Sequence, residues 1–410
     1  FLIAACLIVQ NLHCLVQQDL FIDPNSKESP LNQFPPGSSF ILKQLDNTSG
    51  ISHSSVNTVF QDSDNLLWLG TWDGLNRYDG RTFEVFRPEL NNDLSLSNQV
   101  ILKVTEDGQG YIWVLTMHGI NRYDKRSGNF ERFYFSKKDK IALTDTEFNM
   151  ALSPDKKLFV YAREWGIGVY RSGSFHKVWE DTFLRSPIVK MSFLEKGELL
   201  ILDALGQLSI LRFQEGSGEI RAMGHSTLVE NITDFEILGN KGVLIIDEAG
   251  VPSIFSTLDS KLNKLDVDRP CAIVGKVEGQ VVISTEGTHY LVKTNGELTT
   301  PQWLKVLKGN KLTTLFHGSE DIYWAATDGE GVFKVHRNNK PFHGVSGQQI
   351  PDFEGTIVRS FLEVPGHSFW IGTKGRGVFR FSPDFLDQEN RDLKYVNLNQ
   401  ENSGLNNAVY

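Results

Sequence analysis

A repeated sequence pattern constrains the fold of this chain more than any other feature. Its two clearest copies are Leu67–Asp79 and Ile112–Asp124, which share a Trp, a Thr, a Gly and an Asn-Arg-Tyr-Asp run at equal spacing. The glycines of the two copies, Gly74 and Gly119, lie 45 residues apart. A period of this length is typical of architectures in which each copy forms one small structural unit.

Fainter copies extend the pattern through the rest of the chain. Each has an anchor glycine, an apolar run before it and an apolar residue near the fourth position after it. These anchor glycines are Gly166, Gly206, Gly250, Gly287, Gly331 and Gly377. The period therefore persists where the motif itself is degenerate.

Within one copy, short strands alternate with turn residues. The first copy predicts strands at Val56–Phe60, Leu66–Thr71, Leu75–Tyr78 and Thr82–Phe86, separated by turns rich in Asp, Asn and Gly. Four strands in forty-odd residues are typical of one blade of a β-propeller. We therefore predict an all-β fold, a β-propeller built from four-stranded antiparallel blades.

The copies also predict the domain boundaries. We expect a first propeller at residues 40–346, most simply with seven blades, and the start of a second propeller at 347–410. A single eight-bladed ring is the alternative. The lone predicted strand at Phe40–Leu45 is expected to pair with the other end of the repeat array and close the ring.

The N-terminal segment carries a different signal. Residues 1–18 begin with an apolar run and are predicted to be the remnant of a signal peptide or signal-anchor, with a buried strand or a membrane helix as the alternatives. Residues 19–39 contain four prolines among polar residues and are predicted to be a linker. This arrangement places the propeller outside the cytoplasm.

Charge and cysteine content exclude several functional classes. The net charge of -9, without a block of Lys and Arg, argues against nucleic acid as a partner of this region. Cys6 and Cys14 lie in the leader and leave Cys271 alone, so neither a disulfide framework nor a cysteine metal site is expected. We also find no zinc-protease, nucleophile-elbow or P-loop motif. We predict no catalytic residues, no metal and no cofactor; the acidic run Asp62–Asn65 is explained better as a turn than as a calcium loop.

The run Trp-x-x-Thr-x-x-Gly-x-Asn-Arg-Tyr-Asp, with Leu96–Val100 and the turn at Glu106–Gly108, resembles the two-component regulator propeller repeat. The resemblance is specific in the first two copies and looser from about residue 145 to residue 303. It implies the periplasmic N-terminal sensor region of a hybrid two-component histidine kinase of the Bacteroidetes type, the ectodomain of an inner-membrane protein. It further implies an oligosaccharide ligand derived from glycans, control of polysaccharide-utilisation genes, and a homodimer formed through the full-length receptor. Membrane contact would come only through the leader or through segments beyond these residues.

The blade geometry predicts where a ligand would bind. The turn between the second and third strands of each blade should lie on the same face as the connection to the next blade, so residues just before each anchor glycine should surround one mouth. Aromatic rings and charged groups there would suit a sugar. The predicted ligand-binding residues are Trp72, Asp73, His118, Arg163, Glu164, Trp165, Asp328 and Arg376. For each residue taken alone, an ordinary polar role in the turn is the alternative.

Two other functions remain open at the level of sequence. One is a secreted scaffold that binds another protein. The other is a propeller glycan lyase or glycosidase, which would need two carboxylates or a His-Tyr set at a suitable separation in one mouth.

Overall fold

The structure is a computed structural model that describes residues 40–135, 148–163, 165–180, 186–216, 219–239, 242–337, 350, 356–364, 367–382 and 395–405. The predicted leader and linker, residues 1–39, lie outside these described residues. No helix within the described ranges is long and apolar enough to cross a membrane.

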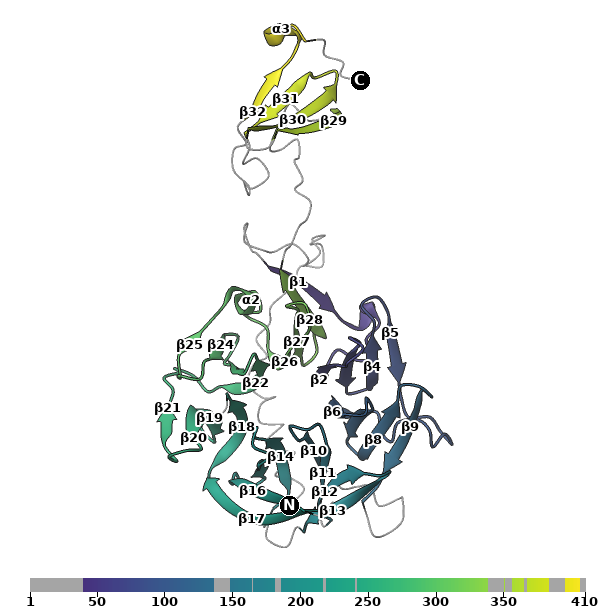
Figure 1. Cartoon of the computed structure of the whole chain (residues 1–410), viewed down its shortest axis with the longest axis vertical. Helices are drawn as coiled ribbons and strands as arrows, with labels where there is room; N and C mark the ends of the chain where they lie inside the picture. Colours follow the sequence, from purple (N-terminus) through teal and green to yellow (C-terminus); the bar gives the residue numbers. More distant parts are fainter. Residues whose placement is uncertain are drawn as a thin grey trace, which may run out of the picture. The chain divides into compact units, whose positions relative to one another are not determined.

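Nearly all of the regular structure is β-strand (Figure 1). The first sheets are β2–β5 (Val56–Gln61, Leu67–Thr71, Gly74–Tyr78, Phe83–Phe86), β6–β9 (Ile101–Glu106, Ile112–Thr116, Gly119–Asp124, Asn129–Phe133) and β10–β13 (Phe148–Leu152, Leu158–Ala162, Gly166–Arg171, Ser174–Trp179). They are followed by β14–β17 (Ile188–Phe193, Leu199–Asp203, Leu208–Gly216, Glu219–Val229) and β18–β21 (Ile232–Leu238, Gly242–Asp247, Pro252–Ser256, Leu262–Lys264).

The next sheet has eight strands. It contains β22–β25 (Ala272–Val277, Gln280–Ser284, His289–Val292, Leu298–Thr299), β26–β28 (Leu312–His317, Tyr323–Thr327, Val332–Arg337) and β1 (Phe40–Leu45). A short parallel pairing of β22 with β26 joins two units of four antiparallel strands. The helical segments are η2 (Asn47–Ser49), α2 (Gln302–Lys305) and α3 (Gln400–Ser403).

Figure 1 shows these sheets arranged around a common centre, with β2, β6, β10, β14, β18, β22 and β26 innermost. Strand β2 contacts β6, β10 contacts β14, β18 contacts β22, and β26 contacts β2, so the order of the sheets follows the chain back to its start. Pairing within each four-stranded unit is antiparallel. The predicted β-propeller architecture is thus confirmed. The number of blades stays a prediction.

Strand β1 closes the ring in the way the sequence predicts. It pairs antiparallel with β28 over six residues, from Phe40 opposite Arg337 to Leu45 opposite Val332. Leu45 is buried in a cluster that also contains Trp324 and Ala326. The two ends of the repeat array are therefore held by main-chain pairing and by packing. Cys271 is a buried free thiol.

The hydrophobic core lies between neighbouring sheets. In one cluster Trp68 and Leu75, from β3 and β4, pack against Ile101, Val104 and Ile112 from β6 and β7. All five side chains are almost completely buried. A single four-stranded sheet has no such cover on its faces, so each blade depends on its neighbours for stability.

The anchor glycines share one backbone conformation. All eight have positive φ, between 77° at Gly377 and 125° at Gly119. A Cβ atom at Gly166 would lie 2.2 Å from the carbonyl oxygen of Trp179, in a neighbouring strand. Glycine is needed here because the backbone is left-handed and because the adjacent chain leaves no room for a side chain. This explains why the glycine persists in the degenerate copies.

The eighth repeat forms a sheet of its own. Strands β29–β32 (Ile357–Val364, Ser368–Lys374, Val378–Phe381, Tyr395–Leu398) are antiparallel neighbours in sequence order. Phe379 and Phe381 are buried against Ile371 in this sheet. The prediction that this repeat begins a second propeller remains a prediction.

Candidate functional site

Turns and interblade loops of successive blades meet on one face, as the blade geometry predicts. The β3–β4 turn is linked to the loop before β6, where the backbone N–H of Gly74 donates to the carbonyl of Gln99 at 2.8 Å. On its other side, Ser52 Oγ lies 2.9 Å from Thr71 Oγ1. The residues before the anchor glycines therefore alternate with connecting loops around the face.

The most regular residues of the repeat support this face from below. Thr71 Oγ1 donates to the carbonyl of Gly74 at 2.9 Å, and Asn76 Nδ2 donates to Ser52 Oγ at 2.8 Å. The second copy makes the same bonds with Thr116, Gly119, Asn121 and Ser97. Both Asn side chains are fully buried. The Thr and Asn of the motif hold the turn to the preceding loop, so we assign them a structural role.

Trp72 and Asp73 differ although they are adjacent. Trp72 is 48% exposed, which is unusual for a large ring in a short turn. The Asp73 carboxylate forms an ion pair with Arg87 at 2.9 Å, and Arg87 Nε also donates to the carbonyl of Asp73. Asp73 therefore ties the turn to the chain that follows β5, whereas Trp72 is available to a ligand.

The other predicted site residues are spread over several blades. His118 Nδ1 lies 3.2 Å from Asn98 Nδ2, and this contact ties the β7–β8 turn to its loop. Asp328 is exposed and its backbone bridges to Ser55, beside the β3–β4 turn. Arg163 is exposed on the β11–β12 turn, and Glu164 lies outside the described residues. Arg376 is exposed on the β30–β31 turn of the separate sheet.

Trp165 lines a groove of about 460 Å³ along the outer side of the β12–β13 hairpin. The ring is half-buried and lies over the backbone of Gly168, where an added Cβ would be 2.2 Å from Trp165 Cη2. Its ring centroid is 4.9 Å from that of Phe135. Trp165 thus packs on its own blade, which the sequence did not predict, and still presents part of its ring to the groove.

The groove combines aromatic rings with a cation. Its walls are Phe133, Tyr134, Phe135, Trp165, Gly173, Ser174, Phe175 and Lys177. Lys177 Nζ lies 5.6 Å from the Trp165 ring centroid, within range of a cation–π contact. The aromatic run Phe133–Phe135, which begins at the last residue of β9 and lies outside the repeat motif, was the sequence signal for this groove and was not among the predicted site residues.

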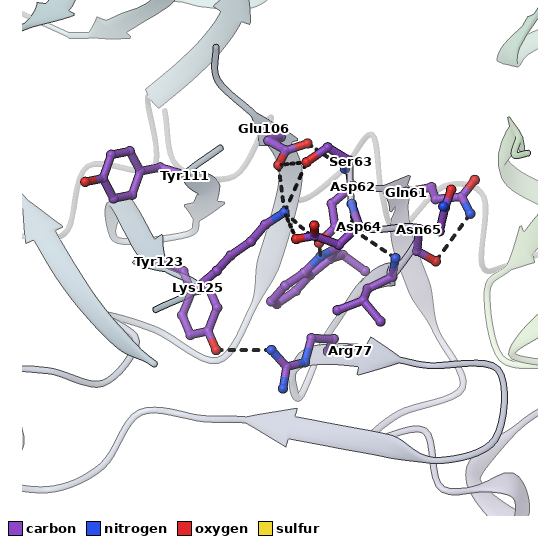
Figure 2. A network of polar contacts seen from close by, with 12 residues as sticks. Gln61, Asp62, Ser63, Asp64, Asn65, Arg77, Glu106, Tyr111, Tyr123 and Lys125 are labelled. Atoms are coloured by element: carbon purple, nitrogen blue, oxygen red, sulfur yellow. Dashed lines mark hydrogen bonds and ion pairs between the residues drawn. The ribbon is translucent and has the colours of Figure 1, made fainter. Parts of the chain in front are cut away.

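A second polar feature joins the first two blades on the side of the β2–β3 turn (Figure 2). We call it the Lys125 cluster; it consists of Asp62, Ser63, Asp64, Glu106 and Lys125. Lys125 Nζ lies 2.7 Å from Asp64 Oδ2, 2.7 Å from Glu106 Oε1 and 3.2 Å from Asp62 Oδ2. Asp62 Oδ2 also accepts from the indole N–H of Trp68 at 2.9 Å.

Hydrogen bonds within the Lys125 cluster offset the effect of burial on its charged groups. Burial alone would lower the pKa of Lys125, but hydrogen bonds to Asp64, Glu106 and Asp62 outweigh it and hold the pKa above its ordinary value. Burial alone would raise the pKa of Glu106, but hydrogen bonds from Lys125 and Ser63 lower it. Among the described residues no group of three or more His, Cys, Asp or Glu side chains is placed to hold a metal. The cluster acts as a clasp between blades, in line with the interpretation of Asp62–Asn65 as a turn.

Replacing Lys125 by Met should lower the free energy of unfolding by about 2 kcal/mol at neutral pH, because Glu106 and Asp62 then lose their counter-ion. The pKa of Glu106 is lower in the folded state than its ordinary value of 4.5, so the ionised carboxylate stabilises the fold at pH values above 4.5. This contribution is lost as the pH falls through the folded-state pKa. The difference between wild type and variant should therefore shrink below about pH 4.5. Urea unfolding of both proteins at about pH 7 and about pH 3 measures this difference in the free energy of unfolding.

Lys261→Met is the matched control for this prediction. Lys261 pairs with Asp259 on the surface, and its side chain is 74% exposed. An exposed pair contributes little, so stability should be unchanged at both pH values. An equal loss of stability at both pH values in the Lys125 variant would contradict the assignment of the pH dependence to Glu106.

Comparison with known proteins identifies the repeat. The family model for the two component regulator propeller matches residues 50–73, which include β2, β3 and the turn that carries Trp72. Residues 50–73 are thus similar to the two component regulator propeller repeat. A stretch of 50 residues is also 46% identical to Histidine kinase P4 from Formosa agariphila, covering 12% of this chain and 4% of that kinase.

Solved structures with a similar fold come from different functional settings. One is the extracellular domain of a protein assigned as a hybrid two component system from B. thetaiotaomicron, with a TM-score of 0.57, 20% identity, and coverage of 84% of this chain and 48% of that one. Another is virginiamycin B lyase from Staphylococcus aureus, with a TM-score of 0.52, 10% identity, and coverage of 72% and 99%. At these identities the similarity shows the propeller fold alone. This chain spans about half the length of the two-component ectodomain.

Proposed function

We propose that this chain is the ligand-sensing propeller of a two-component sensor histidine kinase and that it lies in the periplasm, as the ectodomain of an inner-membrane protein. Two findings support this: the repeat at residues 50–73 and the match to a histidine kinase over 50 residues. The fold shared with an extracellular two-component domain is compatible with it. In this proposal the kinase belongs to the full-length protein, which acts as a homodimer, and the propeller itself performs no catalysis.

We further propose that the ligand is an oligosaccharide released from a glycan and that binding controls polysaccharide-utilisation genes. The observation that carries the ligand class is the groove at Trp165. Its aromatic rings offer flat apolar surfaces for the C–H faces of a sugar, and Lys177 and Ser174 offer donors for hydroxyl groups. The exposed ring of Trp72 adds a second stacking surface at the mouth. Binding would shift the receptor between two arrangements only if the ligand prefers one of them.

Replacing Trp165 by Ala should weaken binding of the cognate oligosaccharide by about tenfold or more, because the stacking surface is lost. Isothermal titration calorimetry against a panel of glycan-derived oligosaccharides measures the affinity, and the thermal unfolding midpoint reports whether the blade remains intact. Trp72→Ala in the same assay tests the mouth independently of the groove.

The outcomes separate the parts of the proposal. Unchanged affinity in the Trp165 variant would remove the groove from the site, while a loss only in the Trp72 variant would move the site to the mouth. If the wild-type chain binds no member of the panel, the oligosaccharide assignment is wrong. For the output, a reporter for polysaccharide-utilisation genes in cells with the full-length receptor should respond to the same sugar.

A further inference from the structure

A pocket of about 310 Å³ lies between the blades β10–β13 and β14–β17, away from the Trp165 groove. Its apolar part consists of Phe159, Phe193 and Phe213. The ring centroids of Phe159 and Phe193 are 4.8 Å apart at a steep angle, and those of Phe159 and Phe213 are 5.4 Å apart. Phe159 is buried, whereas the other two rings are half-buried and border the pocket.

The hydrogen bonds of the turns show that this pocket occupies the same place in the repeat as the Lys125 cluster. The first residue of each turn donates its N–H to the carbonyl four residues later, as Asp62 does to Leu66. Ser153 and Leu194 make the same bond to Lys157 and Glu198. Ser153 therefore corresponds to Asp62. Likewise, Leu194 corresponds to Asp107, which donates to Tyr111 in the second blade.

This correspondence extends to the charged residues. Glu106 precedes Asp107, and Phe193 precedes Leu194, so the two residues hold equivalent positions. Trp113 pairs with Arg122 across the sheet, three residues before Lys125, and Leu200 pairs with Ile210, three residues before Phe213. The glutamate and the lysine that join the first two blades are therefore both replaced by phenylalanine at this junction.

The blade β10–β13 also lacks the arginine that lies against a tryptophan ring in each of the first two blades. The guanidinium groups of Arg77 and Arg122 lie 5.8 Å and 6.0 Å from the ring centroids of the cross-strand partners Trp68 and Trp113. The equivalent pair in this blade is Phe159 and Val169. With neither the arginine nor the lysine, the junction has a cavity lined by aromatic rings where the first junction has a filled ionic clasp.

The rim of the pocket has both signs of charge. Asp155 and Lys157 pair with each other at 2.9 Å. Glu195 and Lys196 are exposed and form no ion pair within the described ranges. A small molecule with an aromatic ring would add another edge-to-face contact to the phenylalanine cluster. An ammonium and a carboxylate on the same molecule would complement the rim.

We propose that this pocket binds a free aromatic amino acid or a close zwitterionic analogue. The volume is at the lower end of the range for small-molecule sites and suits one ring with a short charged chain. The proposal does not depend on the oligosaccharide proposal, since it concerns another blade junction and another class of ligand.

The test is saturation-transfer NMR and calorimetry on the 410-residue chain with L-phenylalanine and L-tryptophan as probes. We expect saturable binding of at least one probe, and binding of 2-phenylethanol, which has the ring without the charges, should be about tenfold weaker. The double variant Phe193→Glu with Phe213→Lys rebuilds the ionic clasp of the first junction and should abolish binding. Phe175→Ala in the Trp165 groove is the matched control and should leave binding of the amino acid unchanged.

A second variant keeps the proposal falsifiable if the double variant fails to fold. Glu195→Gln with Lys196→Gln changes only exposed side chains and should weaken binding about fivefold or more while the unfolding midpoint stays constant. Absence of saturation up to about 10 mM for both probes would overturn the proposal. Equal affinity in wild type and in a folded clasp variant would also overturn it, because binding would then be elsewhere on the chain.

Discussion

A chain that begins at Asp46 instead of Phe40 should lose about 5 kcal/mol or more of unfolding free energy and should unfold at a lower urea concentration. Strand β1 supplies the outermost strand of the sheet that contains β26–β28, and it pairs with β28 along its whole length. Its removal also exposes Trp324 and Val332, which pack against Leu45. The two ends of the repeat array would then be linked through the main chain mainly by the N–H groups of Gly329 and Gly331, which donate to the carbonyl of Ser54.

A chain that begins at Phe40 is the control, since it lacks the leader and the linker but keeps β1. It should match the full chain in its urea midpoint. The shorter chain should also self-associate in size-exclusion chromatography, because β28 then presents an unpaired edge. Equal midpoints for the two truncated chains would show that β1 does not stabilise the ring.

Replacing Trp113 by Ala should destabilise the protein by about 4 kcal/mol, among the largest effects expected of a single substitution here. The ring is fully buried and lies 4.7 Å from the Tyr170 centroid, in the next blade. Its indole N–H also donates to Asp107 Oδ2 at 2.7 Å, so the substitution leaves a cavity together with a buried carboxylate that has lost a donor. Urea unfolding measures the loss.

Trp72→Ala makes the same chemical change at the exposed tryptophan of the preceding blade. Its effect on stability should be below about 0.5 kcal/mol, because the ring leaves no cavity behind. A comparable loss in the two variants would contradict the division into a packing tryptophan and an exposed one. The stability measured for Trp72→Ala also shows whether this variant is folded, which the binding experiment requires.

The sequence was a good guide to local structure. Strand β1 has the predicted bounds, and the predicted strands of the first blade agree with β2–β5 to within one residue at each end. The anchor glycines were found even in degenerate copies because they occupy a left-handed conformation that other residues rarely adopt. Ring closure by β1 was predicted because Phe40–Leu45 was a predicted strand that belonged to no repeat copy.

The sequence was a poorer guide to the site. Because Trp72, His118 and Asp328 lie just before anchor glycines, the sequence correctly placed them on turns. It did not predict the ion pair between Asp73 and Arg87. Nor did it show that Trp165 lies over Gly168 and joins an aromatic groove with Phe135. Contacts of this kind depend on side-chain direction and on residues outside the motif, which the period does not describe.

The sequence alone determined the repeat, the four strands of each unit, the glycine turns and the closing strand, because period, turn chemistry and strand propensity are local properties. Only the tertiary structure decided which surfaces are filled and which stay open. Lys125 fills one blade junction with charge, whereas Phe193 and Phe213 leave an aromatic pocket at another. The filled junction and the open pocket both depend on residues from different blades, which come into contact only when the ring is formed. The spacing of the repeat does not predict these contacts.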